Sequence, residues 1–144
     1  MQKICDRADV TGRATINGHS LILGHAKICD DAYISDHAKV DDYGQVANRA
    51  AIFGNSIVCE YALISNMASV FENAEVKGHA LVFDSARVYG DARVSGYTQV
   101  YGDARVFGDA QVRHRSQVSG GAVIGGDADV KKNEQFSNGT ITST

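Results

Sequence analysis

A hexapeptide repeat runs through almost the whole chain. Stepping by six residues from Ile4 to Val130, every one of the 22 positions is Ile or Val, with no slip of register. Four residues after each of the first 21 stands a small residue, which is Ala in 16 cases. Two residues after the aliphatic in these 21 hexads stands Gly in 11 cases and Asp, Asn or Glu in nine, with His114 as the exception. A fixed period of this kind indicates a repeat architecture.

The hexad predicts a short strand followed by a bend. Ala92 and Val94 stand two residues apart, so in a strand they point to the same side, as do their equivalents in the other hexads. Gly, Asp and Asn tolerate the positive φ of a tight bend. A helix is excluded because a period of six matches no helical face, and β-branched residues favour strands. Strands this short bury their inner faces only by coiling into a solenoid whose coils stack.

The outward residues indicate three hexads in each coil, because like residues tend to pair across stacked strands. Outward aromatic residues recur most often at a separation of three hexads, although separations of one, two and four hexads also occur. The second turn position of every third hexad holds a large side chain. These residues form a predicted corner ladder: His25, Tyr43, Tyr61, His79, Tyr97 and Arg115. We therefore expect a triangular prism of about seven coils, roughly 34 Å tall at about 4.8 Å for each coil.

These hexads resemble those of the hexapeptide-repeat, left-handed parallel β-helix superfamily, and the resemblance covers residues 4–135. The runs at 102–106 and 108–112, Gly-Asp-Ala-x-Val, also resemble the YdcK-type proteins, a group named as transferases. The resemblance implies an all-β, single-domain, left-handed parallel β-helix. Handedness rests on the resemblance alone, since parallel crossovers are generally right-handed.

The repeat weakens at its C-terminal end. Phe136 stands where the next aliphatic residue is due, and Glu134 occupies the preceding small position. We expect residues 1–135 to form the solenoid and residues 136–144 a C-terminal cap and tail. Phe136 is expected to plug the open end of the core, because the terminal units of solenoids need capping. The remaining tail is expected to turn at Asn138-Gly139 or to fray.

Composition excludes several classes of function. The net charge of −3 disfavours a nucleic-acid binder, and no apolar run is long enough to span a membrane. Mimicry of nucleic acid is disfavoured because two arginines dilute the one short acidic corner. The chain begins without the apolar stretch of a signal peptide, and three Cys suit free thiols in a reducing compartment, so a cytoplasmic location is expected.

Large apolar residues fall at outward positions on adjoining faces. They are Phe53, Phe71, Tyr89 and Phe107 in one column, with Phe83, Tyr101, Leu63 and Leu81 nearby. A contiguous exposed apolar patch indicates a partner surface or a ligand groove, whereas stacked aromatics could instead serve only to stabilise the sheet. We expect a non-catalytic structural or protein-interaction module. It is expected to be a homo-oligomer, with a trimer implied by the resemblance and a dimer or a complex with another protein left open.

The alternative function is that of an acyl- or acetyltransferase using acetyl-CoA, because many members of the resembled superfamily are trimeric enzymes with a catalytic His. Those enzymes carry loop insertions or a helical extension, and this sequence has neither. The general-base candidates would be His25, His79, His19 and His37. All four fall at turn positions on exposed corners, where a solvated side chain is expected. No cofactor and no metal site are expected, and no two His are five apart, as the related carbonic anhydrases would require.

Overall fold

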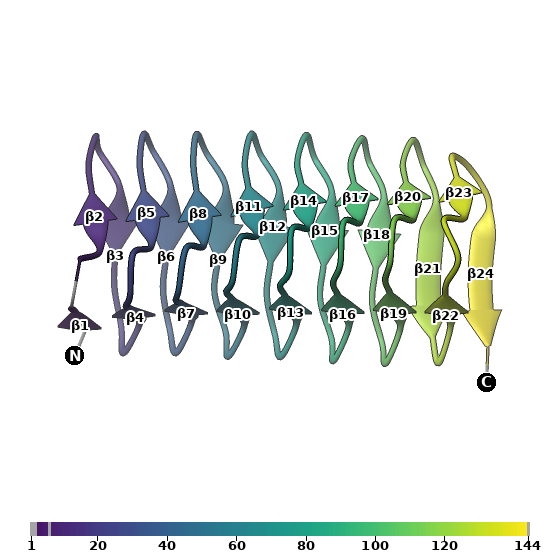
Figure 1. Ribbon diagram of the computed structural model, residues 1–144, viewed down its shortest axis with the longest axis horizontal. Helices are drawn as coiled ribbons and strands as arrows, with labels where there is room; N and C mark the ends of the chain where they lie inside the picture. Colours follow the sequence, from purple (N-terminus) through teal and green to yellow (C-terminus); the bar gives the residue numbers. More distant parts are fainter. Residues whose placement is uncertain (1–2, 6, 144) are drawn as a thin grey trace.

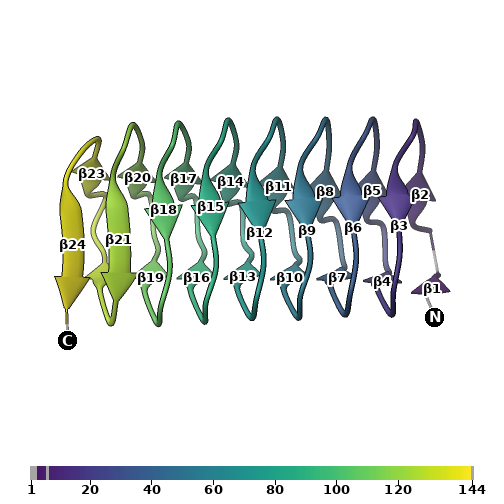
Figure 2. The same cartoon turned by 180° about the vertical axis from the view of Figure 1, so that it is seen from behind.

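The protein is a straight solenoid of stacked coils, and its two ends lie at opposite ends of the stack (Figure 1). The computed structural model describes residues 3–5 and 7–143. Each coil contributes one short strand to each of three parallel sheets, and each sheet contains eight strands. The view from behind shows the third sheet running along the whole stack (Figure 2). The predicted triangular β-solenoid with three hexads in each coil is confirmed.

Most of the strands are two residues long. Sheet A contains β1 (Lys3–Ile4), β4 (Leu21–Ile22), β7 (Lys39–Val40), β10 (Ile57–Val58), β13 (Glu75–Val76), β16 (Arg93–Val94), β19 (Gln111–Val112) and β22 (Asp129–Val130). Sheet B contains β2 (Asp9–Val10), β5 (Lys27–Ile28), β8 (Gln45–Val46), β11 (Leu63–Ile64), β14 (Leu81–Val82), β17 (Gln99–Val100), β20 (Gln117–Val118) and β23 (Gln135–Phe136). Sheet C contains β3 (Thr15–Ile16), β6 (Tyr33–Ile34), β9 (Ala51–Ile52), β12 (Ser69–Val70), β15 (Arg87–Val88), β18 (Arg105–Val106), β21 (Val123–Gly126) and β24 (Thr140–Ser143).

The core is built from the Ile, Val and Ala of the hexads. In the inner coils these residues are fully buried, and the aliphatic of one strand pairs with its equivalents in the coils before and after, as Val58 does with Val40 and Val76. Four small positions hold a hydroxyl residue instead of Ala or Gly. Each hydroxyl donates a hydrogen bond of 2.7–2.9 Å to the carbonyl oxygen three residues earlier: Ser20 to Asn17, Ser56 to Phe53, Thr98 to Ser95, and Ser116 to Arg113. A buried hydroxyl is therefore tolerated because its donor is satisfied.

The corners depend on residues with positive φ. Among the described residues, eleven other than Gly adopt φ between 56° and 68°, and Asp, Asn and Glu account for nine of them. Several of their side chains satisfy backbone donors in the next coil. Oδ2 of Asp36 accepts from the Gly54 amide at 3.1 Å, and Oε2 of Glu72 accepts from the Gly90 amide at 2.7 Å. These hydrogen bonds offset part of the cost of the left-handed conformation.

The last coil extends beyond the solenoid that the repeat predicts. Phe136 lies in β23, pairs with Val118 and is half-buried against the core. The tail then forms β24, which pairs with the four-residue strand β21, so that Ile141 lies beside Ile124. The step from Ile124 to Ile141 falls one residue short of three hexads, which is why the hexad pattern gives no sign of an eighth coil.

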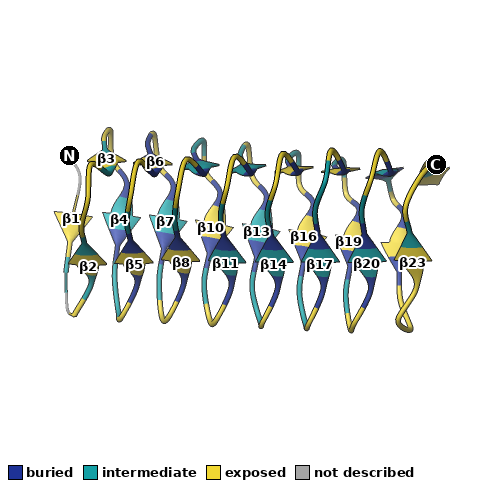
Figure 3. Ribbon diagram, turned by 90° about the horizontal axis from the view of Figure 1, so that it is seen from above, coloured by how far each residue is buried: buried dark blue, intermediate teal, exposed yellow. Residues whose placement is uncertain are grey.

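Exposure is concentrated at the corners and at the two ends of the stack (Figure 3). Every residue of β1 is exposed, whereas the inward residue of β4 in the next coil is fully buried. In the part of the chain that the structure describes, no helix has the length and apolar character needed to cross a membrane.

Candidate interaction surface

Five aromatic rings stack along the corner between sheets A and B. His25, Tyr43, Tyr61, His79 and Tyr97 have successive ring centroids 4.8–4.9 Å apart and interplanar angles of 3–5°. Arg115 ends this corner ladder, with its guanidinium carbon 5.8 Å from the centroid of the Tyr97 ring. The rings superpose because residues three hexads apart occupy the same place in successive coils, about 4.8 Å apart.

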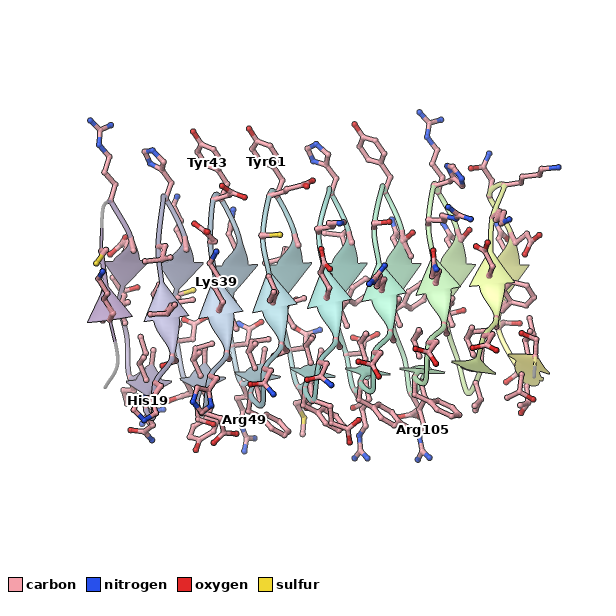
Figure 4. All side chains as sticks on the ribbon, turned by 90° about the horizontal axis from the view of Figure 1, so that it is seen from below. His19, Lys39, Tyr43, Arg49, Tyr61 and Arg105 are labelled. Carbon is pink, nitrogen blue, oxygen red and sulfur yellow. The ribbon has the colours of Figure 1, made fainter. Side chains whose placement is uncertain are left out.

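The tyrosines of the corner ladder are among the most exposed large apolar side chains. Tyr43, Tyr61 and Tyr97 have exposed fractions of 45%, 54% and 58%. Tyr43 and Tyr61 project side by side from this corner, while His19, Arg49 and Arg105 lie on the opposite side of the molecule (Figure 4). The ladder therefore presents a ridge of ring edges and hydroxyl groups to solvent.

A second aromatic column lies on the outer surface of sheet C. Phe53, Phe71 and Tyr89 stack with centroids 4.9 Å apart, and Phe107 follows at 5.3 Å from Tyr89. The sequence predicts exposed rings here, but all four are half-buried. Each ring covers the face of its neighbour, so stacking accounts for the loss of exposure.

The outer surface of sheet B carries the other four predicted interface residues. Leu63 pairs with Leu81 in register, and the rings of Phe83 and Tyr101 stack at 4.9 Å with an interplanar angle of 1°. These four side chains are also half-buried. We call the eight residues on sheets B and C the aromatic face. The two groups lie on adjoining sides of the prism.

Two further exposed residues, on sheet C and on the corner between sheets B and C, are not among those that the sequence pattern predicts. Met67 lies at the corner between β11 of sheet B and β12 of sheet C, with an exposed fraction of 59%. Tyr33 lies on sheet C, paired with Ala51, and is also exposed. The turn position of Met67 in its hexad would have revealed it, because this corner separates the two predicted columns.

The four candidate catalytic histidines lie at corners and all take part in ring stacking. His19 stacks on His37 at 5.1 Å, while His25 and His79 belong to the corner ladder. Among the described residues, no hydrogen bond links the imidazoles of His25, His37 or His79 to a carboxylate. Nor do the described residues contain a group of three or more His, Cys, Asp or Glu arranged to hold a metal ion.

The three cysteines are free thiols and half-buried. Burial raises the pKa of the Cys59 thiol to about 11, and the neighbouring carboxylates of Glu60 and Glu75 act in the same direction. Burial and the Asp30 carboxylate also raise the pKa of Cys29. A raised pKa depletes the reactive thiolate, so neither side chain is suited to act as a nucleophile.

Part of the chain that carries the aromatic face also matches a known family of repeats. A family model described as the YdcK Beta solenoid repeat matches residues 86–100 and 98–114. Residues 86–114 carry YdcK beta solenoid repeats. The matched YdcK repeats contain Tyr89, Tyr97, Tyr101 and Phe107, so both aromatic columns and the corner ladder pass through them. Comparisons with curated proteins and with solved structures find no match.

Proposed function

We propose that the chain is a non-catalytic structural or protein-interaction module that binds further copies of itself through the aromatic face. One observation carries this proposal. Eight large apolar side chains gather on two adjoining sides of a rigid prism, with the exposed Met67 on the corner between them. Soluble monomers rarely expose a contiguous apolar patch of more than a few hundred Å².

The area that remains exposed on the aromatic column of sheet C contributes to association but is not sufficient alone. Aromatic side chains present about 150–250 Å² each, and the four half-buried rings keep about a third of that or less, so they leave at most roughly 200–350 Å² for a partner to cover. At about 25 cal/mol for each Å², covering that area contributes at most roughly 5–9 kcal/mol. The loss of translational and rotational freedom costs about 4–15 kcal/mol. Stable association therefore also needs Leu63, Leu81, Phe83, Tyr101 and Met67.

A closed, cyclic homo-oligomer suits this surface, because closure leaves no aromatic face exposed at the end of the assembly. We propose a trimer, the stoichiometry implied by the resemblance, located in the cytoplasm. The straight, regular stack supports the proposal, since a rigid prism loses little conformational freedom when another prism packs against it.

Light scattering on the purified chain tests the proposal. At tens of micromolar we expect the wild type to have the mass of an oligomer and Phe71→Glu/Phe107→Glu to have the mass of a monomer. The matched control is Ser95→Glu/Gln111→Glu, which adds two carboxylates to sheet A in neighbouring coils and should keep the oligomer. A monomeric wild type would contradict the proposal, as would a double Phe variant that keeps the oligomeric mass.

The non-catalytic part of the proposal is supported by His25, His37 and His79, whose rings stack at corners and form no hydrogen bond to a carboxylate among the described residues. Titration with acetyl-CoA tests this part separately. We expect no binding at micromolar concentrations. Micromolar binding that disappears in His79→Ala would instead favour an acyltransferase.

A further inference from the structure

The corner between sheets A and B changes character in its last coils. The corner ladder of Tyr and His rings ends at Tyr97, and the next two residues in the same column are Arg115 and Asn133. In the neighbouring turn column, Gly96 is followed by His114 and Lys132. Both replace the Gly, Asp, Asn or Glu of other coils while keeping a positive φ, 68° for His114 and 60° for Lys132.

His114 does not repeat the structural role of the acidic turn residues. Asp42, at the same corner, accepts a hydrogen bond from the Glu60 amide of the next coil at 3.3 Å. The side chain of His114 has no hydrogen-bond or ion-pair partner among the described residues. A residue other than Gly is strained in the left-handed region, and among the described residues this imidazole makes no hydrogen bond or ion pair that offsets the strain. The turn alone therefore does not explain the choice of His.

The same residues line an open cleft of about 420 Å³. Its walls are formed by Gly96, Tyr97, His114, Arg115 and Asn133, which come from three successive coils. The guanidinium of Arg115 lies over the Tyr97 ring. The side chains of the lining residues bring a guanidinium, an imidazole, a phenol and a carboxamide to the cleft, and all four can donate hydrogen bonds. Among the described residues, no carboxylate lines it.

The charges around the cleft favour an anion. The segments 113–115 and 129–134 contain the four cations Arg113, Arg115, Lys131 and Lys132 and the two carboxylates Asp129 and Glu134, although the whole chain carries a charge of −3. Asp129 is already engaged by two of these cations: Nε of Arg113 donates to its Oδ1 at 3.0 Å, and Nζ of Lys131 lies 2.8 Å from its Oδ2. In the described chain, Arg115 forms no ion pair with a carboxylate.

We propose that this cleft binds an anion of the phosphate class, either inorganic phosphate or a phosphate monoester, through Arg115 and His114. The planar guanidinium matches the geometry of phosphate oxygens, and its stacking on Tyr97 restricts its orientation before the anion arrives. The imidazole of His114 and the carboxamide of Asn133 supply further donors. This site is independent of the aromatic face, which lies on sheets B and C.

Titration of the full-length chain with inorganic phosphate at constant ionic strength tests the proposal. The His114 imidazole resonances in NMR spectra report on the site, and isothermal titration calorimetry gives the affinity. We expect saturable shifts of these resonances, and Arg115→Tyr should weaken binding about tenfold or more while extending the corner ladder. His114→Gly should also weaken binding while raising the melting temperature, because Gly adopts a positive φ without strain. If His114 served folding alone, its replacement by Gly would not lower the phosphate affinity while raising the melting temperature.

The matched control is Arg49→Gln, which removes an arginine from a second cleft lined by Arg13, Asp31 and Arg49. There the carboxylate of Asp31 already pairs with Arg13 at 2.8 Å, so this variant should keep the wild-type affinity for phosphate. A second titration uses methyl phosphate. Binding of either probe supports the proposal, and the probe that binds more tightly identifies the ligand as the free ion or as a monoester. Shifts that sodium chloride reproduces, or an affinity unchanged in Arg115→Tyr, would overturn it.

Discussion

The ring of Phe107 lies against the backbone of Gly125 in the next coil. A Cβ atom placed on Gly125 would stand 2.7 Å from Cε2 and 2.8 Å from Cε1 of this ring. Gly125 is buried although it occupies an outward position, and its φ is not positive. Gly is therefore required here for space. Its backbone is the surface against which Phe107, the last ring of the aromatic column of sheet C, packs.

Replacing Gly125 by Ala should displace the Phe107 ring and destabilise the fold by about 1–3 kcal/mol, the usual cost of overpacking. Denaturant unfolding of Gly125→Ala measures the loss. Gly121→Ala is the matched control. Apart from its chain neighbours, the one described residue that would approach its Cβ is Asn138, with Oδ1 at 3.8 Å, so the stability of this variant should change little. Equal stability of the two variants would contradict the packing of Phe107 on Gly125.

The corner residue Asp84 should stabilise the fold through the coils on either side. Its φ is 58°, its Oδ2 accepts from the Gly102 amide at 3.2 Å, and its Oδ1 accepts from Nδ2 of Asn66 at 3.0 Å. Asp84→Ala should cost about 1–3 kcal/mol, because Ala is strained at positive φ and removes both acceptors. Asp84→Asn keeps one acceptor and tolerates positive φ, so thermal unfolding should place it between Asp84→Ala and the wild type. A neutral Asp84→Ala would rule out this role for the side chain.

The sequence predicts the core of the hexad coils, but it predicts the last coil and the outer surface only in part. The pairing of Val40, Val58 and Val76 follows from the hexad, since one backbone geometry repeats. The eighth coil escapes prediction because Ile141, which pairs with Ile124, stands one position before the place that the hexad register assigns. The sequence also does not predict that the Phe71 ring is half-buried, because the stacking of side chains depends on their rotamers, which the periodicity does not specify.

The core assignment of Val82 predicts a large loss of stability. Val82 is fully buried in β14, so Val82→Asp places a carboxylate among apolar side chains without a partner. We expect a loss of about 3–5 kcal/mol or failure to fold, measured by circular dichroism during thermal unfolding. The control is Gln99→Asp on the outer surface of the next coil, which should unfold close to the wild type. Unchanged melting of Val82→Asp would contradict the register of the core.

The raised pKa of Cys59 predicts slow alkylation. Burial disfavours the thiolate, so with a pKa of about 11 in the folded protein the thiol is almost fully protonated at pH 8. A free cysteine has a pKa of about 8.5, so alkylation of Cys59 at pH 8 should be roughly two orders of magnitude slower and should accelerate as the pH rises towards 11. Iodoacetamide labelling followed by peptide mass spectrometry measures the rate, and Cys59→Ser verifies the assignment of the peptide. Labelling at the rate of free cysteine would show that the thiol is not protected.

Hydroxyl-radical footprinting at increasing protein concentration tests most directly whether copies associate through the aromatic face. Met67 lies at the corner between sheets B and C, whereas Tyr43 lies at the corner between sheets A and B. We predict that oxidation of Met67 falls several-fold as the oligomer forms, while oxidation of Tyr43 stays constant. In Phe71→Glu/Phe107→Glu, Met67 should remain reactive at every concentration. Unchanged oxidation of Met67 in the wild-type oligomer, or protection of Tyr43 in its place, would contradict association through this face.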